Sequence, residues 1–442
     1  MKILFISLGC DKNLVDTEMM LGMLGREGFS FTDDEAEAEI IVVNTCCFIQ
    51  DAKEESINTI LEMAEWKKTG KAKALLVCGC LAQRYKEEIQ KEIPEVDCIL
   101  GTTAIDQIAE AVKEVLEGKA IGMEHVSDIN RKPVQGQKRV VTTGGHYAYL
   151  KIAEGCDKNC TYCIIPKVRG RFRSIPIEVL VKEAEELAEQ GVKELILVAQ
   201  ETTLYGVDIY GEKSLPLLLD KLNEIPGLHW IRILYCYPEE ITGELIKAIK
   251  RNDKVCHYLD IPIQHGSDVV LKRMGRRTTS GQLREVIAKL RDAIPDICLR
   301  TSLITGFPGE TLDDHEILMN FVDDMEFDRL GVFTYSQEED TPAALMENQI
   351  DEEEKRQRRE QIMALQQEIA FEKNENMIGQ KLMVIIEGKL EEDGVYVGRS
   401  YKDAPNVDGY VFVHADNSLM TGDFVPVMIT GSHEYDLIGE VK

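Results

Sequence analysis

Short apolar runs alternate with segments of helical periodicity at the start of the chain. The runs of strand-like composition cover residues 2–8, 40–43 and 74–77. Between them, residues 15–27 and 49–66 place apolar side chains at helical spacing. Strands that alternate with helices indicate a parallel sheet, so we expect an N-terminal parallel α/β domain over residues 1–130.

The alternation resumes after a polar segment, residues 131–145, whose glycines and Pro133 are typical of a linker. Six further strands are expected at residues 147–152, 194–199, 229–234, 258–261, 298–305 and 329–334. Helices are expected between them at residues 177–190, 215–223, 239–251, 281–293 and 312–325. Six such units in series predict a barrel or partial barrel of parallel strands over residues 146–377. Its functional site should lie at the carboxyl ends of the strands.

The last part of the chain has a different pattern. Residues 351–377 are highly charged with a partial apolar stripe, which predicts a solvated helix that connects two domains. From residue 378 to 442, short strands are expected at residues 381–387, 395–400, 409–414, 424–431 and 435–441, with glycines between them. This spacing predicts a small antiparallel β-barrel.

The chain has 442 residues, 44% of them hydrophobic, which suits two or three domains with sizeable cores. It has no apolar run of 18 or more residues, so no membrane span is expected. The first residues lack the longer apolar region of a signal peptide. We expect a cytoplasmic protein whose twelve cysteines are ligands or reduced core residues rather than disulfides.

The formal net charge of −27 bears on the partner. A protein that grips a phosphate backbone usually presents a basic face, so this charge favours a basic protein over free nucleic acid. Residues 378–442 agree, with five Lys or Arg against eleven Asp or Glu. Solubility alone is the alternative explanation, and Arg169, Arg171 and Arg173 could still form a local basic patch.

Three cysteines, Cys156, Cys160 and Cys163, follow one strand-like run with the spacing C-x3-C-x2-C. Iron–sulfur clusters are normally held by four thiolates. Three thiolates this close can hold a cubane cluster and leave its fourth iron open to a substrate. A structural zinc site is the alternative, but no C-x2-C or H-x3-5-H pair stands nearby to complete it.

Cys10, Cys46 and Cys80 each follow one of the three N-terminal strands. The carboxyl ends of parallel strands meet at one edge of the sheet, which makes a second three-cysteine cluster site plausible. Free cysteine is also among the most buried residue types, so ordinary packing is the alternative. We interpret the other six cysteines as packed or core residues: Cys47, Cys78, Cys98, Cys236, Cys256 and Cys298.

Several polar or turn residues are predicted at the carboxyl ends of the barrel strands. They are Gln200, Gln264, Gly306, Gly309 and Glu310. Each is a weak signal alone. The Gly-Phe-Pro-Gly segment, for example, could be no more than a turn. Their common position at one rim makes them candidate ligand contacts.

With these residues assembled, the whole chain resembles the methylthiotransferases of the radical S-adenosylmethionine (SAM) superfamily. The N-terminal cluster ligands of the family match Cys10 in SLGCDKN, Cys46 in VVNTC and Cys80 in GCLAQR. Its radical SAM ligands match the three cysteines of EGCDKNCTYCIIPKVRGR. The resemblance implies an N-terminal methylthiotransferase domain, a radical SAM partial (β/α)6 barrel and a C-terminal TRAM domain.

Within the family, several segments resemble the subgroup that modifies a ribosomal protein. They are ISLGCDKNLVDTE, IPIQHGSD, GRSYKDAPNVDG and HEYDLIGEV. Three features depart from that pattern. Asp11 replaces a common proline, Glu201 stands where aspartate is frequent, and KRMGRRTT is closer to the enzymes that modify transfer RNA.

The resemblance implies two [4Fe–4S] clusters and SAM as cofactors. The cluster on Cys156, Cys160 and Cys163 would bind SAM, with the rim residues as contacts, and generate a radical after reduction by a flavodoxin- or ferredoxin-like donor. The other cluster would handle the sulfur, and a second SAM would supply the methyl group. The implied product is a β-methylthio-aspartate on small-subunit ribosomal protein twelve, bound through the acidic TRAM domain. The alternatives are the same chemistry on an adenosine of transfer RNA and a non-catalytic iron–sulfur protein.

Overall fold

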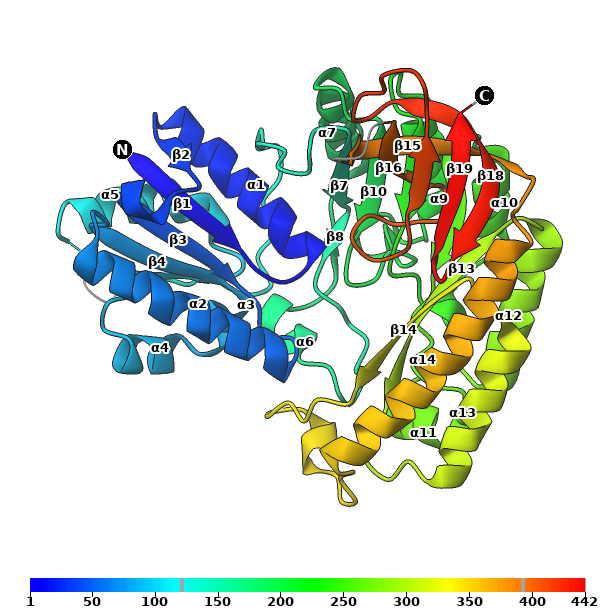
Figure 1. Ribbon diagram of the computed structural model, residues 1–442. Helices are drawn as coiled ribbons and strands as arrows, with labels where there is room; N and C mark the ends of the chain where they lie inside the picture. The colour runs from blue at the N-terminus through cyan, green and yellow to red at the C-terminus, as the bar shows by residue number, and fades with distance from the viewer. Residues whose placement is uncertain (120–122, 391–393, 442) are drawn as a thin grey trace.

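The structure of the chain is a computed structural model that describes residues 1–119, 123–390 and 394–441. Figure 1 shows a blue-to-cyan N-terminal α/β unit beside a green-to-yellow sheet with its helices, and a red C-terminal barrel against that second sheet. Among the described residues, no helix is long and apolar enough to cross a membrane.

The N-terminal unit is a six-stranded parallel sheet in the order β2-β1-β3-β4-β5-β6. Its strands are β1 (Lys2–Ser7), β2 (Ser30–Thr32), β3 (Ile40–Thr45), β4 (Ala74–Gly79), β5 (Cys98–Leu100) and β6 (Met123–His125). The central strands β3 and β4 are buried along their whole length, as expected of a parallel sheet covered on both faces. The sequence pattern predicted these two and β1 but missed the three-residue strands, which are too short to show a period.

Helices cover both faces of this sheet. They are α1 (Asp11–Arg26), α2 (Gln50–Thr69), α3 (Cys80–Arg84), α4 (Lys86–Glu92) and α5 (Ile108–Leu116). Ile40 and Val42 pack with α1 and α5, whereas Ile41 and Val43 pack with α2. The alternation of side chains along a strand therefore separates two cores. The core on the α1 and α5 side also contains residues of the middle sheet, such as Tyr149 and Val198, and the core on the α2 side also contains Ile164 and Val168.

The middle sheet has six parallel strands in the order β14-β13-β12-β11-β10-β7. Its strands are β7 (Tyr147–Lys151), β10 (Glu194–Val198), β11 (Trp230–Ile233), β12 (Val255–Asp260), β13 (Cys298–Thr305) and β14 (Arg329–Thr334). The connecting helices are α7 (Ile177–Glu189), α8 (Val207–Tyr210), α9 (Leu215–Asn223), α10 (Gly243–Arg251), α11 (Asp268–Arg273), α12 (Ser280–Ala293) and α13 (Leu312–Met325). The predicted partial barrel of parallel strands is confirmed.

The helix after β14, α14 (Glu352–Glu375), is not the solvated connector that its charge predicted. Ile362 is fully buried among the barrel core, and the Gln366 amide donates a hydrogen bond to the Phe327 carbonyl at 2.8 Å. The charged residues of α14 lie mainly on its other faces. The low overall hydrophobicity of the segment therefore did not indicate that one face packs against the barrel core.

The C-terminal segment forms the predicted closed barrel, in the order β15-β16-β17-β19-β18. Its strands are β15 (Lys381–Lys389), β16 (Val395–Ser400), β17 (Val411–His414), β18 (Phe424–His433) and β19 (Asp436–Val441). One pair, β17 with β19, is parallel, whereas the other pairings are antiparallel.

The C-terminal barrel is fixed to the middle sheet by buried ion pairs. Glu194 on β10 accepts hydrogen bonds from Arg232 on β11 and from Arg399 on β16, both at 2.7 Å, and all three side chains are 0% exposed. In the loop after β16, Asp403 pairs with Arg329 at 2.6 Å. The GRSYKDAPNVDG segment therefore has a structural role in joining two parts of the chain.

Candidate cluster and cofactor site

Cys10, Cys46 and Cys80 lie together just beyond the carboxyl ends of the neighbouring strands β1, β3 and β4. Burial raises the pKa of Cys46 to about 12, and the nearby Cys80 and Cys10 thiols raise it further. Clustered thiols resist ionisation in the absence of a cation, and a bound metal group would remove that cost. The expected meeting of these cysteines is thus present in the fold.

Glycines and asparagines set the positions of these thiols. Gly9 has φ +88°, and a Cβ on it would lie 2.6 Å from the Cys46 Cβ, so only glycine fits immediately before Cys10. The Asn13 amide donates to the carbonyls of Leu8 and Thr45, both at 3.0 Å. These bonds tie the end of β1 to the end of β3 and thereby fix the separation of their cysteines.

Cys46 and Cys47 are adjacent but face different surroundings. Cys46 is close to both Cys10 and Cys80, as the causes of its raised pKa show. Burial also raises the pKa of Cys47, but its neighbours are Cys80, Cys46 and Arg84 rather than Cys10, and it is 0% exposed within the core around α2. The geometry therefore favours Cys46 over Cys47 as a ligand.

The second set of thiols lies on the loop between β8 (Ala153–Glu154) and α6 (Ile165–Arg169). Burial raises the pKa of Cys156 to about 12, and the Cys160 thiol adds to this. The Cys160 sulfur lies 3.4 Å from the Tyr237 hydroxyl. Burial and the Cys160 and Cys156 thiols also raise the pKa of Cys163.

The donor sets suit a cluster better than a single ion. Within the described ranges, no three Cys, His, Asp or Glu side chains are close enough to share one metal ion. A zinc site would need such convergence. A cubane distributes its thiolates over separate irons, so grouped but non-convergent thiols are compatible with it.

Two buried groups with unused hydrogen-bonding atoms lie beside the Cys156–Cys163 loop. Arg276 is 7% exposed and stacks 4.2 Å from the Tyr237 ring centroid, and its Nε and Nη1 have no partner among the described residues. Glu201 is 0% exposed, its Oε2 is also unpartnered there, and burial raises its pKa to about 7. In the sequence, Glu201 stands at a predicted strand end and departs from the family pattern, whereas no local signal distinguishes Arg276 from Arg277.

The rim residues have defined positions, and their ligand roles stay predictions. Gln200 donates to Glu154 at 2.8 Å, and the backbone of Gln264 bridges to Ser302 and Ile304. The tight glycine loop packs its first glycine, Gly306, against Lys355 and its second, Gly309, against Arg273. The Glu310 carboxylate already accepts hydrogen bonds from the Phe307 amide at 3.0 Å and from Arg358 at 2.8 Å, so it supports that loop from inside.

Comparison with known families matches three consecutive parts of the chain. Residues 2–101 match the uncharacterized protein family UPF0004, residues 150–322 match the radical SAM superfamily, and residues 378–441 match the TRAM domain. The two cysteine sets fall in the first and second matches.

Similar curated proteins extend over the full chain. The ribosomal protein uS12 methylthiotransferase RimO of Lachnoclostridium phytofermentans is 64% identical over 442 residues, which is 100% of both chains. The RimO protein of Clostridioides difficile is 50% identical over 441 residues, covering 100% of this chain and 99% of its own. The chain belongs to the RimO family.

Solved structures share the fold of this RimO family member. TsrM from Kitasatospora setae, a radical S-adenosylmethionine methyltransferase, aligns with a TM-score of 0.55 at 14% identity, over 89% of this chain and 79% of its own. The cobalamin-dependent radical enzyme OxsB aligns with a TM-score of 0.52 at 15% identity, over 78% and 54% of the two chains. The likeness shows a common architecture only.

Buried charges connect the two cysteine sets of this RimO family member. Arg169, at the end of α6, pairs with Asp16 on α1 at 2.7 Å and with Glu154 at 3.1 Å. Lys151 pairs with the same two carboxylates. Because Arg169 is 2% exposed, it cannot join Arg171 and Arg173 in the local basic surface patch that the three arginines could have formed.

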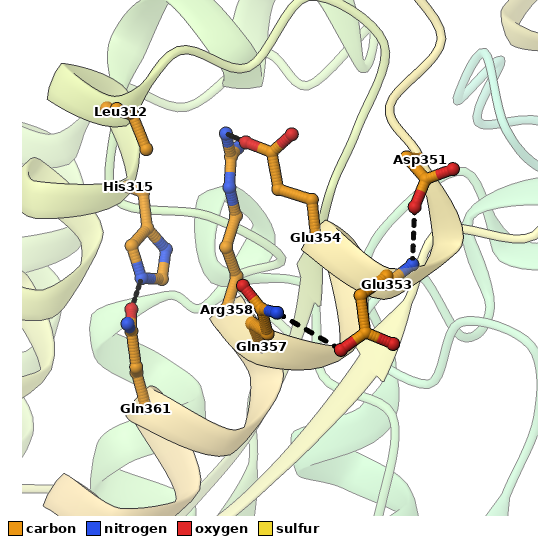
Figure 2. A pocket seen from close by; sticks show the side chains of 8 residues that line it. All are labelled: Leu312, His315, Asp351, Glu353, Glu354, Gln357, Arg358 and Gln361. Carbon is orange, nitrogen blue, oxygen red and sulfur yellow. Dashed lines mark hydrogen bonds and ion pairs between the residues drawn. The ribbon is translucent and has the colours of Figure 1, made fainter.

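A surface pocket of about 430 Å³ lies elsewhere, between α13 and α14. Figure 2 shows that its lining side chains bond to one another: the His315 ring to Gln361, and Arg358 to Glu354. No cysteine lines it. We assign it no part in the RimO chemistry.

Proposed function

We propose that this chain is a radical SAM methylthiotransferase that inserts a methylthio group at the β-carbon of an aspartate in ribosomal protein uS12. The observation that carries the proposal is the presence of two separate, grouped three-cysteine sets in one chain. The full-length similarity to RimO proteins supports the choice of reaction and substrate. The β-carbon of aspartate carries no acidic hydrogen, so a radical route is chemically reasonable.

Two [4Fe–4S] clusters and SAM, when bound, would supply electron transfer, hydrogen abstraction, sulfur and the methyl group. One cluster would be held by Cys10, Cys46 and Cys80, and the other by Cys156, Cys160 and Cys163. The protein orients these groups and excludes water. None of the six cysteines is fully exposed to solvent, because Cys46, Cys80, Cys156 and Cys160 are buried and Cys10 and Cys163 are intermediate.

Arg276 and Glu201 would bind the charged end of SAM, which carries one carboxylate and one amino group. Each has a buried polar atom without a partner among the described side chains, and such an atom costs free energy unless a ligand pairs with it. Gln200, Gln264, Gly306, Gly309 and Glu310 would complete or support this part of the site.

For the partner, the charge of the whole chain, −27, supports a basic protein rather than transfer RNA. Docking through the TRAM domain is part of the proposal, although Asp403 and the Asp408 side chain lie inside the interface with the middle sheet. The acidic count also includes Glu391, Glu392 and Asp393, which lie outside the described residues. A cytoplasmic location and a flavodoxin- or ferredoxin-like electron donor complete the proposal.

The test is activity on both substrates. The reconstituted holoenzyme should add a methylthio group to purified uS12, detected by mass spectrometry of its peptides, and leave transfer RNA unmodified. Methylthioadenosine in transfer RNA beside unmodified uS12 would contradict the substrate. Absence of 5′-deoxyadenosine with SAM and dithionite would contradict any radical mechanism.

Replacing Arg276 should weaken SAM binding. Arg276→Gln removes a charge-assisted hydrogen bond worth about 1.5–3 kcal/mol, so the SAM dissociation constant should rise about 10- to 150-fold. Equilibrium dialysis of the holoprotein with labelled SAM measures this directly. The adjacent Arg277 is exposed, and Arg277→Gln provides the matched control. Equal affinities of the two variants would refute a role for Arg276.

A further inference from the structure

Arg169 joins the two cysteine sets physically. It is the last residue of α6, six residues after Cys163, and α6 packs into the N-terminal core through Ile164 and Val168. The Thr102 hydroxyl donates to the Val168 carbonyl at 2.9 Å. Helix α6 follows the Cys156–Cys163 loop in the sequence, but it packs against the N-terminal unit that carries Cys10, Cys46 and Cys80 (Figure 1).

The guanidinium of Arg169 reaches one of the candidate ligands directly. Its Nε donates to the Cys80 sulfur at 3.3 Å, and its Nη2 donates to the Asn13 side-chain oxygen. Asn13 is the residue that ties the ends of β1 and β3. Arg169 therefore contacts both the Cys80 thiol and the scaffold that positions Cys10 and Cys46.

The charges around Arg169 are balanced and buried. Two cations, Arg169 and Lys151, face two carboxylates, Asp16 and Glu154, and each of these side chains is 6% exposed or less. Charges removed from water act more strongly on their neighbours than exposed ones do. Loss of one member would leave a net charge next to Cys80.

We propose that Arg169 is a positioning residue that sets the reduction potential of the cluster on Cys10, Cys46 and Cys80, through its hydrogen bond to the Cys80 sulfur and its buried charge. This inference rests on the proposed function. Hydrogen bonds to the sulfurs and the net charge nearby are established determinants of cluster potential. A donor and a positive charge both favour the reduced, more negative cluster, so their removal should lower the potential.

The test isolates the N-terminal cluster. In a parent with Cys156, Cys160 and Cys163 replaced by alanine, iron should be about four per chain, and redox titration followed by electron paramagnetic resonance gives its midpoint potential. Arg169→Met should lower the reduction equilibrium constant by about tenfold, which is ~59 mV for one electron. Arg171→Met, an exposed arginine two residues away, should match the parent.

Asp16→Asn separates an electrostatic from a structural role. It breaks the same ion pair but removes a negative charge, so the potential should rise. If the reduction potential shifts in the same direction in Arg169→Met and Asp16→Asn, the inference is overturned. It is also overturned if Arg169→Met binds about four irons and has the same reduction potential as the parent. If Arg169→Met does not fold, Arg169→Gln decides, because glutamine removes the charge and keeps an N–H donor. A downward shift of the potential supports the proposal, and an unchanged potential refutes it. A parent without iron overturns the proposed function and this inference with it.

Discussion

Replacement of Cys46 by alanine is expected to remove one cluster and abolish methylthio transfer while SAM cleavage continues. The iron content of the reconstituted protein should fall from about eight to about four per chain. The Cys156–Cys163 loop lies outside the N-terminal sheet and keeps its three thiols, so 5′-deoxyadenosine should still form. Iron and sulfide analysis, together with chromatography of the products, measures both results on one preparation.

Cys47→Ala is the matched control, because Cys47 is the next residue and is fully buried in the core around α2. It should retain about eight irons and lose only packing, at a cost of about 1 kcal/mol. Loss of four irons in Cys47→Ala but not in Cys46→Ala would reverse the assignment. If both variants retain about eight irons per chain, the assignment of a cluster site to the N-terminal unit is contradicted.

The sequence was sufficient to place the cysteines because parallel strands impose a simple geometry. Residues that follow β1, β3 and β4 must meet at one edge, so the sequence alone is enough to group Cys10, Cys46 and Cys80. The alternation of strand and helix patterns likewise predicted the six parallel strands of the middle sheet. The sequence pattern missed β2, β5 and β6, whose three residues each are too few to show a period.

The buried charges could not be predicted in the same way. The chain has 129 charged residues, from 51 Lys or Arg and 78 Asp or Glu, and nothing local distinguishes Arg169 from Arg171 or Arg276 from Arg277. Their environments differ because of contacts with residues more than a hundred positions away, such as Asp16 for Arg169. Pairing across such distances in sequence is a property of the assembled fold.

A second large effect is expected at the interface of the C-terminal barrel. Glu194→Gln keeps the shape of the side chain but leaves Arg232 and Arg399 buried beside a neutral amide. Breaking a buried ion pair by removal of one partner costs about 3–5 kcal/mol. Trp230 reports on this interface, since its ring lies 4.8 Å from that of Phe424. With Trp66 replaced by phenylalanine, Trp230 is the single tryptophan, and its fluorescence follows opening of the interface in urea.

Lowering the pH should reduce the difference in unfolding free energy between Glu194→Gln and the wild type. Although burial alone would raise the pKa of Glu194, the adjacent Arg399 and Arg232 hold it below its ordinary value of 4.5. A carboxyl with a lowered folded pKa contributes stability above the unfolded pKa, and that contribution is lost as the pH falls through the folded pKa. The stability difference should therefore be largest near neutral pH and decline below about pH 4.5. Glu244→Gln, which breaks an ion pair with side chains 68% and 71% exposed, should have no measurable effect at any pH. A Glu194→Gln variant as stable as this control near neutral pH would show that the interface does not depend on the buried charge.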